Sequence, residues 1–135
     1  MILVDANALI SICDKGQANH AQFARFIEQS NADLVTTLPC LTEAMYFMGK
    51  YAGWRGQEIL WLFISNYSLM VHPLDSADLN RMRSLMKKYF DVPMDFADAS
   101  LVRTAESIET SRILTSDSDF GVYRINGRKH FEIIP

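Results

Sequence analysis

The sequence predicts an α/β protein, a three-layer α/β/α sandwich around a mainly parallel central sheet. Two observations predict this fold. Short apolar segments, several of them β-branched, alternate along the chain with longer segments of helical pattern. The chain has 135 residues, 49% of them hydrophobic, with no linker, internal repeat or low-complexity stretch. We therefore expect one domain, residues 1–135, with a substantial buried core.

The elements of the first half follow from local patterns. Residues 1–4 are an apolar run that ends at an acid, which indicates a buried strand. Phe23 and Ile27 share one face of a predicted helix, Pro39 suits a first helical turn, and Gly53 separates two helices. After the first strand we expect, in order, a helix over 6–13, a helix over 20–29, a strand over 34–37, and helices over 39–51 and 55–66.

The second half continues the alternation of strands and helices. Asp75 or Ser76 caps a helix that runs to about residue 90, and Pro93 stops it. The other elements we expect are a strand over 69–71, a helix over 95–108, a strand over 113–115 and a closing strand over 131–134.

Composition excludes several classes of protein. The net charge is −3, from 13 basic and 16 acidic residues, so a broad basic face for duplex DNA is not expected. The longest apolar run, residues 59–64, is far shorter than the ~20 residues that span a bilayer. The opening residues show no basic segment or cleavage pattern of a secretory signal. We expect a cytoplasmic protein without a membrane anchor.

The cysteines and histidines do not form a recognisable site. Cys13 and Cys40 stand alone, without the spacing of a zinc site, and are expected to be core residues without a disulfide. His20, His72 and His130 lie far apart and are expected to be structural or exposed.

Four acids occupy positions that surface solubility does not explain. Asp5 and Asp117 follow the first and the fourth predicted strands. In an open parallel sheet, side chains at the carboxyl ends of strands converge on one crevice. Asp98 and Glu43 lie within otherwise apolar helical segments, where a buried carboxylate is costly without compensation. The pattern favours one acidic cluster.

Each acid also has a separate, simpler explanation. Asp5 alone reads as a helix N-cap, Asp117 as a turn residue and Glu43 as a solvated side chain. Asp98 alone reads as the partner of an arginine, such as Arg103. A shared site is preferred because no basic residue is close in sequence to Asp5, Glu43 or Asp98. Crowded carboxylates suit Mg²⁺ or Mn²⁺ rather than zinc, and such a site fits phosphodiester hydrolysis by a metal-activated water.

Four segments carry a resemblance to a known family. They are Ile-Leu-Val-Asp-Ala-Asn-Ala-Leu at 2–9, Leu-Thr-Glu-Ala at 41–44, Met-Asp-Phe-Ala-Asp-Ala-Ser-Leu at 94–101 and Leu-Thr-Ser-Asp-Ser-Asp-Phe at 114–120. In their order and spacing the chain resembles PIN-domain nucleases, and more narrowly the VapC-type toxins of toxin–antitoxin pairs. The resemblance covers essentially the whole chain.

The resemblance implies an endoribonuclease that uses Mg²⁺ or Mn²⁺. The acidic quartet that it implies is Asp5, Glu43, Asp98 and Asp117, with Asp119 as a further possible metal ligand. Asn7 matches a polar position that supports the first acid, and Ser116 or Thr115 matches a hydroxyl position beside the last one. Asp95 is either an outer-shell ligand or an ordinary acid at a helix N-terminus.

The resemblance also implies partners: an RNA substrate, a cognate antitoxin and a second copy in a homodimer. The candidates to hold RNA are Arg103, Arg124, Arg128 and Lys129, for which a scatter of solvated charges is the preferred alternative, together with the Arg81, Arg83, Lys87 and Lys88 group, for which a solvated face is preferred. The alternative function is a catalytically weak interaction module that binds a partner through the aromatic helical hairpin at 45–64. A phosphatase is disfavoured because Asn7 stands where its second Asp is required.

Overall fold

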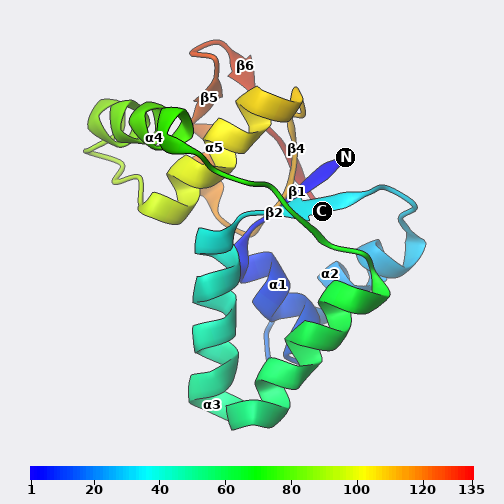
Figure 1. Cartoon of the computed structure of the whole chain (residues 1–135). Helices are drawn as coiled ribbons and strands as arrows, with labels where there is room; N and C mark the ends of the chain where they lie inside the picture. Colours follow the sequence, from blue (N-terminus) through cyan, green and yellow to red (C-terminus); the bar gives the residue numbers. More distant parts are fainter.

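The computed structural model describes residues 1–135 and contains a five-stranded sheet flanked by helices (Figure 1). Its strands are β1 (Ile2–Val4), β2 (Leu34–Thr36), β3 (Met70–Val71), β4 (Arg112–Leu114) and β7 (Glu132–Ile134). They lie in the order β3-β2-β1-β4-β7, and every neighbouring pair is parallel. The predicted parallel sheet and all five predicted strands are confirmed.

The helices form two layers, one on each face of this sheet. They are α1 (Ala6–Cys13), α2 (His20–Gln29), α3 (Leu38–Asn66), α4 (Ser76–Lys88) and α5 (Phe96–Ile108), followed by the short 3₁₀ helix η1 (Ser118–Gly121). Side chains alternate between the faces of a strand, so Ile2 and Val4 pack with α1, α2 and α3, whereas Leu3 packs with α4 and α5. The predicted α/β/α sandwich is therefore confirmed.

Helix α3 is a hairpin of two arms. Gly53 has φ 61° and ψ −153°, a conformation outside the helical region that only glycine adopts readily. The two arms diverge from this point and flank α1 (Figure 1). The prediction of two helices separated by Gly53 is confirmed.

A small β-hairpin was not predicted. Strands β5 (Arg124–Ile125) and β6 (Lys129–His130) pair antiparallel next to α5 (Figure 1). The turn contains Asn126 and Gly127, with φ values of 52° and 71°. An Asn-Gly pair is a strong hairpin signal because both residues tolerate positive φ, so the sequence did contain the information.

Two simpler expectations concern the core and the membrane. Cys13 and Cys40 are free and buried, as expected of small core residues. None of the helices combines the length and the apolar character that crossing a membrane requires.

Candidate active site

The candidate site lies at the carboxyl edge of the sheet, where β1 and β4 run side by side. Val4 and Leu114 are register partners, and the Asp5 amide donates to the Leu114 carbonyl at 3.1 Å. Because both strands end here, Asp5 and the 115–117 segment leave the sheet at the same edge. Strand β1 lies between β2 and β4, so the order of the strands reverses direction at β1. In parallel sheets, ligands bind at the carboxyl edge beside such a reversal.

Asp5 is fixed by hydrogen bonds to both carboxylate oxygens. Its Oδ1 accepts from the Ala6 amide at 2.6 Å, so Asp5 is the N-cap of α1. Its Oδ2 accepts from Thr115 Oγ1 at 2.8 Å and from Asn7 Nδ2 at 3.1 Å. Asn7 Oδ1 in turn accepts from the Ser116 amide at 2.9 Å. The simple N-cap explanation is therefore correct for Asp5, but it covers only one of its two oxygens.

Asp98 enters the site from the first turn of α5. Asp95 is the N-cap of that helix, and its Oδ1 accepts from the Asp98 amide at 2.7 Å. The Asp95 amide donates back to Asp98 Oδ2 at 3.4 Å, which completes a capping box. The Tyr123 hydroxyl donates to the same Oδ2 at 2.9 Å. These contacts hold Asp98 in a site where only 7% of it is exposed.

Asp5, Asp98 and Asp117 come together although they lie far apart in sequence. Each offers one carboxylate oxygen, and these oxygens all lie within 4.8 Å of one another. Asp5 and Asp98 are buried and Asp117 is half-buried, as the N-cap of η1. We call these three residues the acidic triad.

Burial makes ionisation of Asp5 and Asp98 unfavourable. Desolvation raises the pKa of Asp5 from 3.8 to about 6, and the negative charge of Asp117 adds to this effect. Desolvation likewise raises the pKa of Asp98 from 3.8 to about 7, with a further contribution from the charge of Asp95. Hydrogen bonds from Thr115 and Tyr123 oppose these shifts without cancelling them.

The protein itself supplies no cation to the acidic triad. None of its salt bridges involves Asp5, Asp98 or Asp117. A set of crowded carboxylate oxygens without a basic partner matches the hard oxygen ligands that Mg²⁺ and Mn²⁺ prefer. The residues at this edge of the sheet therefore fit a divalent cation.

The other acids of the predicted site lie outside this group. Glu43 is exposed on α3. Partial desolvation raises its pKa, and the negative charges of Asp95 and Asp5 raise it further, so Glu43 lies close enough to both acids to interact with them electrostatically. The Asp119 amide donates to Asp117 Oδ1 at 2.9 Å, and its carboxylate is not among the triad oxygens. Asp95 is an exposed N-cap.

Several basic residues considered as RNA contacts have other partners. Arg103 does not pair with Asp98, and its Nε donates instead to Asp78 Oδ1 at 2.6 Å. Arg81 makes two hydrogen bonds to Glu106, at 2.9 and 2.8 Å. Arg124 Nη1 donates to three nearby backbone carbonyls. The remaining residues of those predicted groups, Arg83, Lys87, Lys88, Arg128 and Lys129, are exposed.

Two supporting residues differ in how far the sequence revealed them. The predicted hydroxyl position was Ser116 or Thr115, and the structure selects Thr115, whose Oγ1 reaches Asp5. Tyr123 was not predicted at all, since nothing distinguishes it from the other aromatic residues along the chain. Only the Asn126-Gly127 turn signal could have placed it beside α5, at the base of a hairpin.

Comparison with known proteins assigns the fold to a family. Residues 2–126 match the PIN domain, and the chain belongs to this family.

The relatives it is similar to carry VapC names. It is 24% identical over 135 residues to "Ribonuclease VapC26" of Mycobacterium tuberculosis, covering 99% of this chain and 100% of that protein. The fold is similar to that of Mycobacterium tuberculosis VapC20, described as a sarcin-ricin loop cleaving toxin, with a TM-score of 0.82, 15% identity, and coverage of 90% and 94% of the two chains. It is also similar to a chain of VapBC2 from Rickettsia felis, solved with a promoter DNA fragment, with a TM-score of 0.70, 16% identity and full coverage of both chains.

Proposed function

We propose that the protein is an endoribonuclease that depends on Mg²⁺ or Mn²⁺ and hydrolyses RNA phosphodiester bonds. The observation that carries this proposal is the acidic triad, whose oxygens lie within 4.8 Å of one another without a basic partner. Membership of the PIN domain family and the similarity to a protein named as a ribonuclease support the choice of reaction.

In this proposal the residues of the site have different roles. Asp5, Asp98 and Asp117 would hold the cation, and Thr115 and Asn7 orient Asp5 through hydrogen bonds at 2.8 and 3.1 Å. When bound, Mg²⁺ or Mn²⁺ would supply an activated water and neutralise charge on the phosphate.

Glu43 is the outer member of the proposed quartet. It is exposed, but partial desolvation and the charges of Asp95 and Asp5 raise its pKa, which suits a carboxylate that accepts a proton from the attacking water. Asp119, whose amide donates a hydrogen bond to Asp117 Oδ1, stays a possible metal ligand.

Cleavage of RNA by purified protein tests the proposal. Wild type, Asp98→Asn and Asp91→Asn are incubated with total cellular RNA in Mg²⁺, in Mn²⁺ and in EDTA, and the new ends are mapped by sequencing. Asp91 is an exposed acid outside the triad, so Asp91→Asn makes the same chemical change as a control. We expect discrete, metal-dependent cuts from wild type and Asp91→Asn, and none from Asp98→Asn. Equal cutting by Asp98→Asn, or no cutting by any sample, would refute the assignment.

We also propose a protein partner, an antitoxin of the kind present in toxin–antitoxin complexes. A cavity of about 640 Å³ lies between α1 and the α3 hairpin, lined by apolar side chains that include Ile12, Phe47 and Ile59. Trp54 and Trp61 on the same hairpin are 63% and 50% exposed, more than core packing requires. Solved VapBC complexes among the similar folds support this choice of partner. We also propose that the chain acts as a toxin in the cytoplasm.

The catalytically weak interaction module is the second candidate, and the same exposed hairpin favours it. The cleavage assay separates the two, because a module of this kind would bind its partner and leave RNA intact under every metal condition. The predicted homodimer is tested by light scattering on a size-exclusion column, which reports twice the 15.4 kDa chain mass for a dimer.

A further inference from the structure

Tyr123 is fully buried, and its hydroxyl donates to Asp98 Oδ2 at 2.9 Å. A buried tyrosine hydroxyl needs a hydrogen-bond partner, and here that partner is a proposed metal ligand. We infer that Tyr123 is a positioning residue of the cation site, whose hydroxyl fixes the orientation of the Asp98 carboxylate. The inference rests on the proposed metal-dependent function.

The pattern of hydrogen bonds to Asp98 shows why its carboxylate needs a residue that fixes its orientation. The Asp95 amide and the Tyr123 hydroxyl both donate to Oδ2, at 3.4 and 2.9 Å, which leaves Oδ1 without a hydrogen-bond partner in the protein. The terminal torsion of an aspartate is broad, so the carboxylate rotates easily unless hydrogen bonds hold it. The 3.4 Å bond is long, and the shorter bond from Tyr123 is therefore the main restraint.

Contacts with neighbouring aromatic rings fix the position of the Tyr123 ring. It meets the ring of Phe120 edge-on, with centroids 5.1 Å apart and planes at 86°, and that of Tyr89 at 5.1 Å and 68°. Phe120 in turn packs edge-on against Phe131 at 5.3 Å. Such edge-to-face contacts are favourable and directional, so the hydroxyl is presented from a rigid aromatic cluster.

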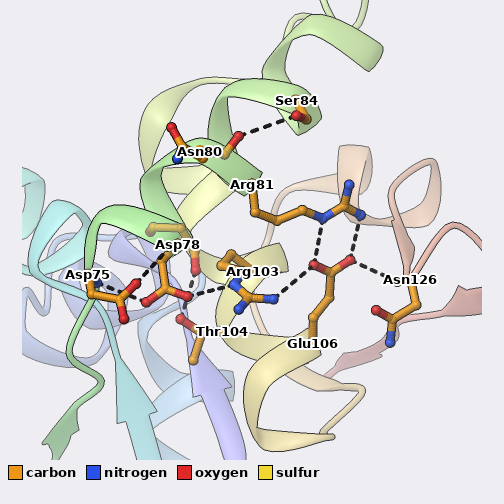
Figure 2. A network of polar contacts seen from close by, with 10 residues as sticks. Asp75, Asp78, Asn80, Arg81, Ser84, Arg103, Thr104, Glu106 and Asn126 are labelled. Carbon is orange, nitrogen blue, oxygen red and sulfur yellow. Dashed lines mark hydrogen bonds and ion pairs between the residues drawn. The ribbon is translucent and has the colours of Figure 1, made fainter.

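The backbone that follows Tyr123 is anchored by a second group of contacts. Glu106 accepts two hydrogen bonds from Arg81 and one at 2.9 Å from the Asn126 amide, in the turn of the β5–β6 hairpin (Figure 2). Arg103 joins the group from α5, with its Nη1 3.8 Å from Glu106 (Figure 2). Helices α4 and α5 thus fix the hairpin, and the hairpin fixes the base of the segment that carries Tyr123.

Tyr123→Phe removes the hydroxyl and keeps the ring, so it tests the inference directly. Tyr67→Phe is the control, since it makes the same chemical change at an exposed side chain at the end of α3, outside the acidic triad and the aromatic cluster around Tyr123. Mn²⁺ affinity of the full-length proteins is measured from the electron paramagnetic resonance signal of free Mn²⁺, after circular dichroism has verified folding. We expect roughly 10- to 100-fold weaker Mn²⁺ binding by Tyr123→Phe, the usual effect of losing a residue that orients a ligand. Tyr67→Phe is expected to bind as wild type does.

Rescue by metal gives a second readout that a purely structural role would not change. RNA cleavage by Tyr123→Phe should fall at low Mn²⁺ and recover as Mn²⁺ is raised, whereas Asp98→Asn should stay inactive at every concentration. Wild-type Mn²⁺ affinity in Tyr123→Phe would overturn the inference, as would an equal loss in Tyr67→Phe or a failure of excess Mn²⁺ to restore cleavage. Wild type that binds Mn²⁺ but cleaves no RNA would refute the proposed reaction alone, and the comparison of Mn²⁺ affinities would still decide the inference. Wild type that binds no Mn²⁺ would overturn both.

Discussion

Asp98→Asn is expected to stabilise the metal-free protein while it abolishes metal binding. Asp98 is 7% exposed and has no basic partner, so its charge is unfavourable whenever no cation is bound. Asparagine has nearly the same shape. Its side-chain oxygen can accept the hydrogen bonds that Tyr123 and the Asp95 amide now donate to Oδ2. The substitution removes the charge and keeps the contacts.

The shifted pKa sets the size and the sign of this effect. Burial raises the pKa of Asp98 from 3.8 to about 7, and each pKa unit corresponds to about 1.4 kcal/mol, so the upper limit at pH 7.5 is about 4 kcal/mol. The edge of the site that carries Glu43 is exposed, and screening by solvent reduces this to about 1–2 kcal/mol. The folded state retains a proton that the unfolded state releases. The contribution of Asp98 to the free energy of unfolding of the wild-type protein therefore falls as pH rises from about 4 through about 7.

Urea unfolding in EDTA, followed by circular dichroism at pH 7.5 and pH 5, measures the effect. We expect a higher free energy of unfolding for Asp98→Asn than for wild type at pH 7.5, and a smaller difference at pH 5. Excess Mn²⁺ should reverse the order at pH 7.5, because only wild type gains stability from binding it. A variant less stable than wild type in EDTA at pH 7.5 would refute the reasoning.

Three further predictions concern the rest of the fold. Gly53→Ala is expected to lower stability by about 1–3 kcal/mol, because alanine is strained at φ 61°, although its Cβ would meet no atom; equal urea midpoints would contradict this. Burial alone would raise the pKa of Glu106, but hydrogen bonds from Arg81 and the Asn126 amide lower it overall, so the charged form is the stable one. Glu106→Gln is therefore expected to cost about 1–3 kcal/mol in urea unfolding at pH 7.5, and a neutral result would show that the ion pairs contribute nothing net. Burial raises the pKa of the Cys13 thiol to about 12 and also raises that of Cys40, so thiol reagents should label neither in native protein and both in urea; rapid native labelling would contradict the buried placement.

The sequence was most informative where strand ends and apolar patterns coincide. Asp5 and Asp117 could be placed together because parallel strands end at one edge, and β1 and β4 do lie side by side. Asp98 was identified by its apolar neighbours, and the structure brings it to the same point. The alternative pairing of Asp98 with Arg103 was wrong, because Arg103 reaches Asp78 on α4, a contact set by helix packing.

Other features depend on three-dimensional packing that periodicity does not encode. The distance of Glu43 from the acidic triad is determined by how the first arm of α3 packs, and the sequence pattern alone did not separate Glu43 from the other acids. Tyr123 and Asp98 are 25 residues apart in the sequence, and only the tertiary fold brings them into contact. The β5–β6 hairpin is a different case, since Asn126-Gly127 signalled it in the sequence.

The location of a bound cation tests the proposed site most directly. A crystal of the wild-type protein, grown in Mn²⁺ and measured near the manganese absorption edge, would show the ion by its anomalous scattering. We predict a peak with carboxylate oxygens of Asp5, Asp98 and Asp117 among its ligands, and no peak at this position in Asp98→Asn crystals grown identically. A manganese peak elsewhere on the protein, with none at the acidic triad under saturating Mn²⁺, would contradict the proposed metal site.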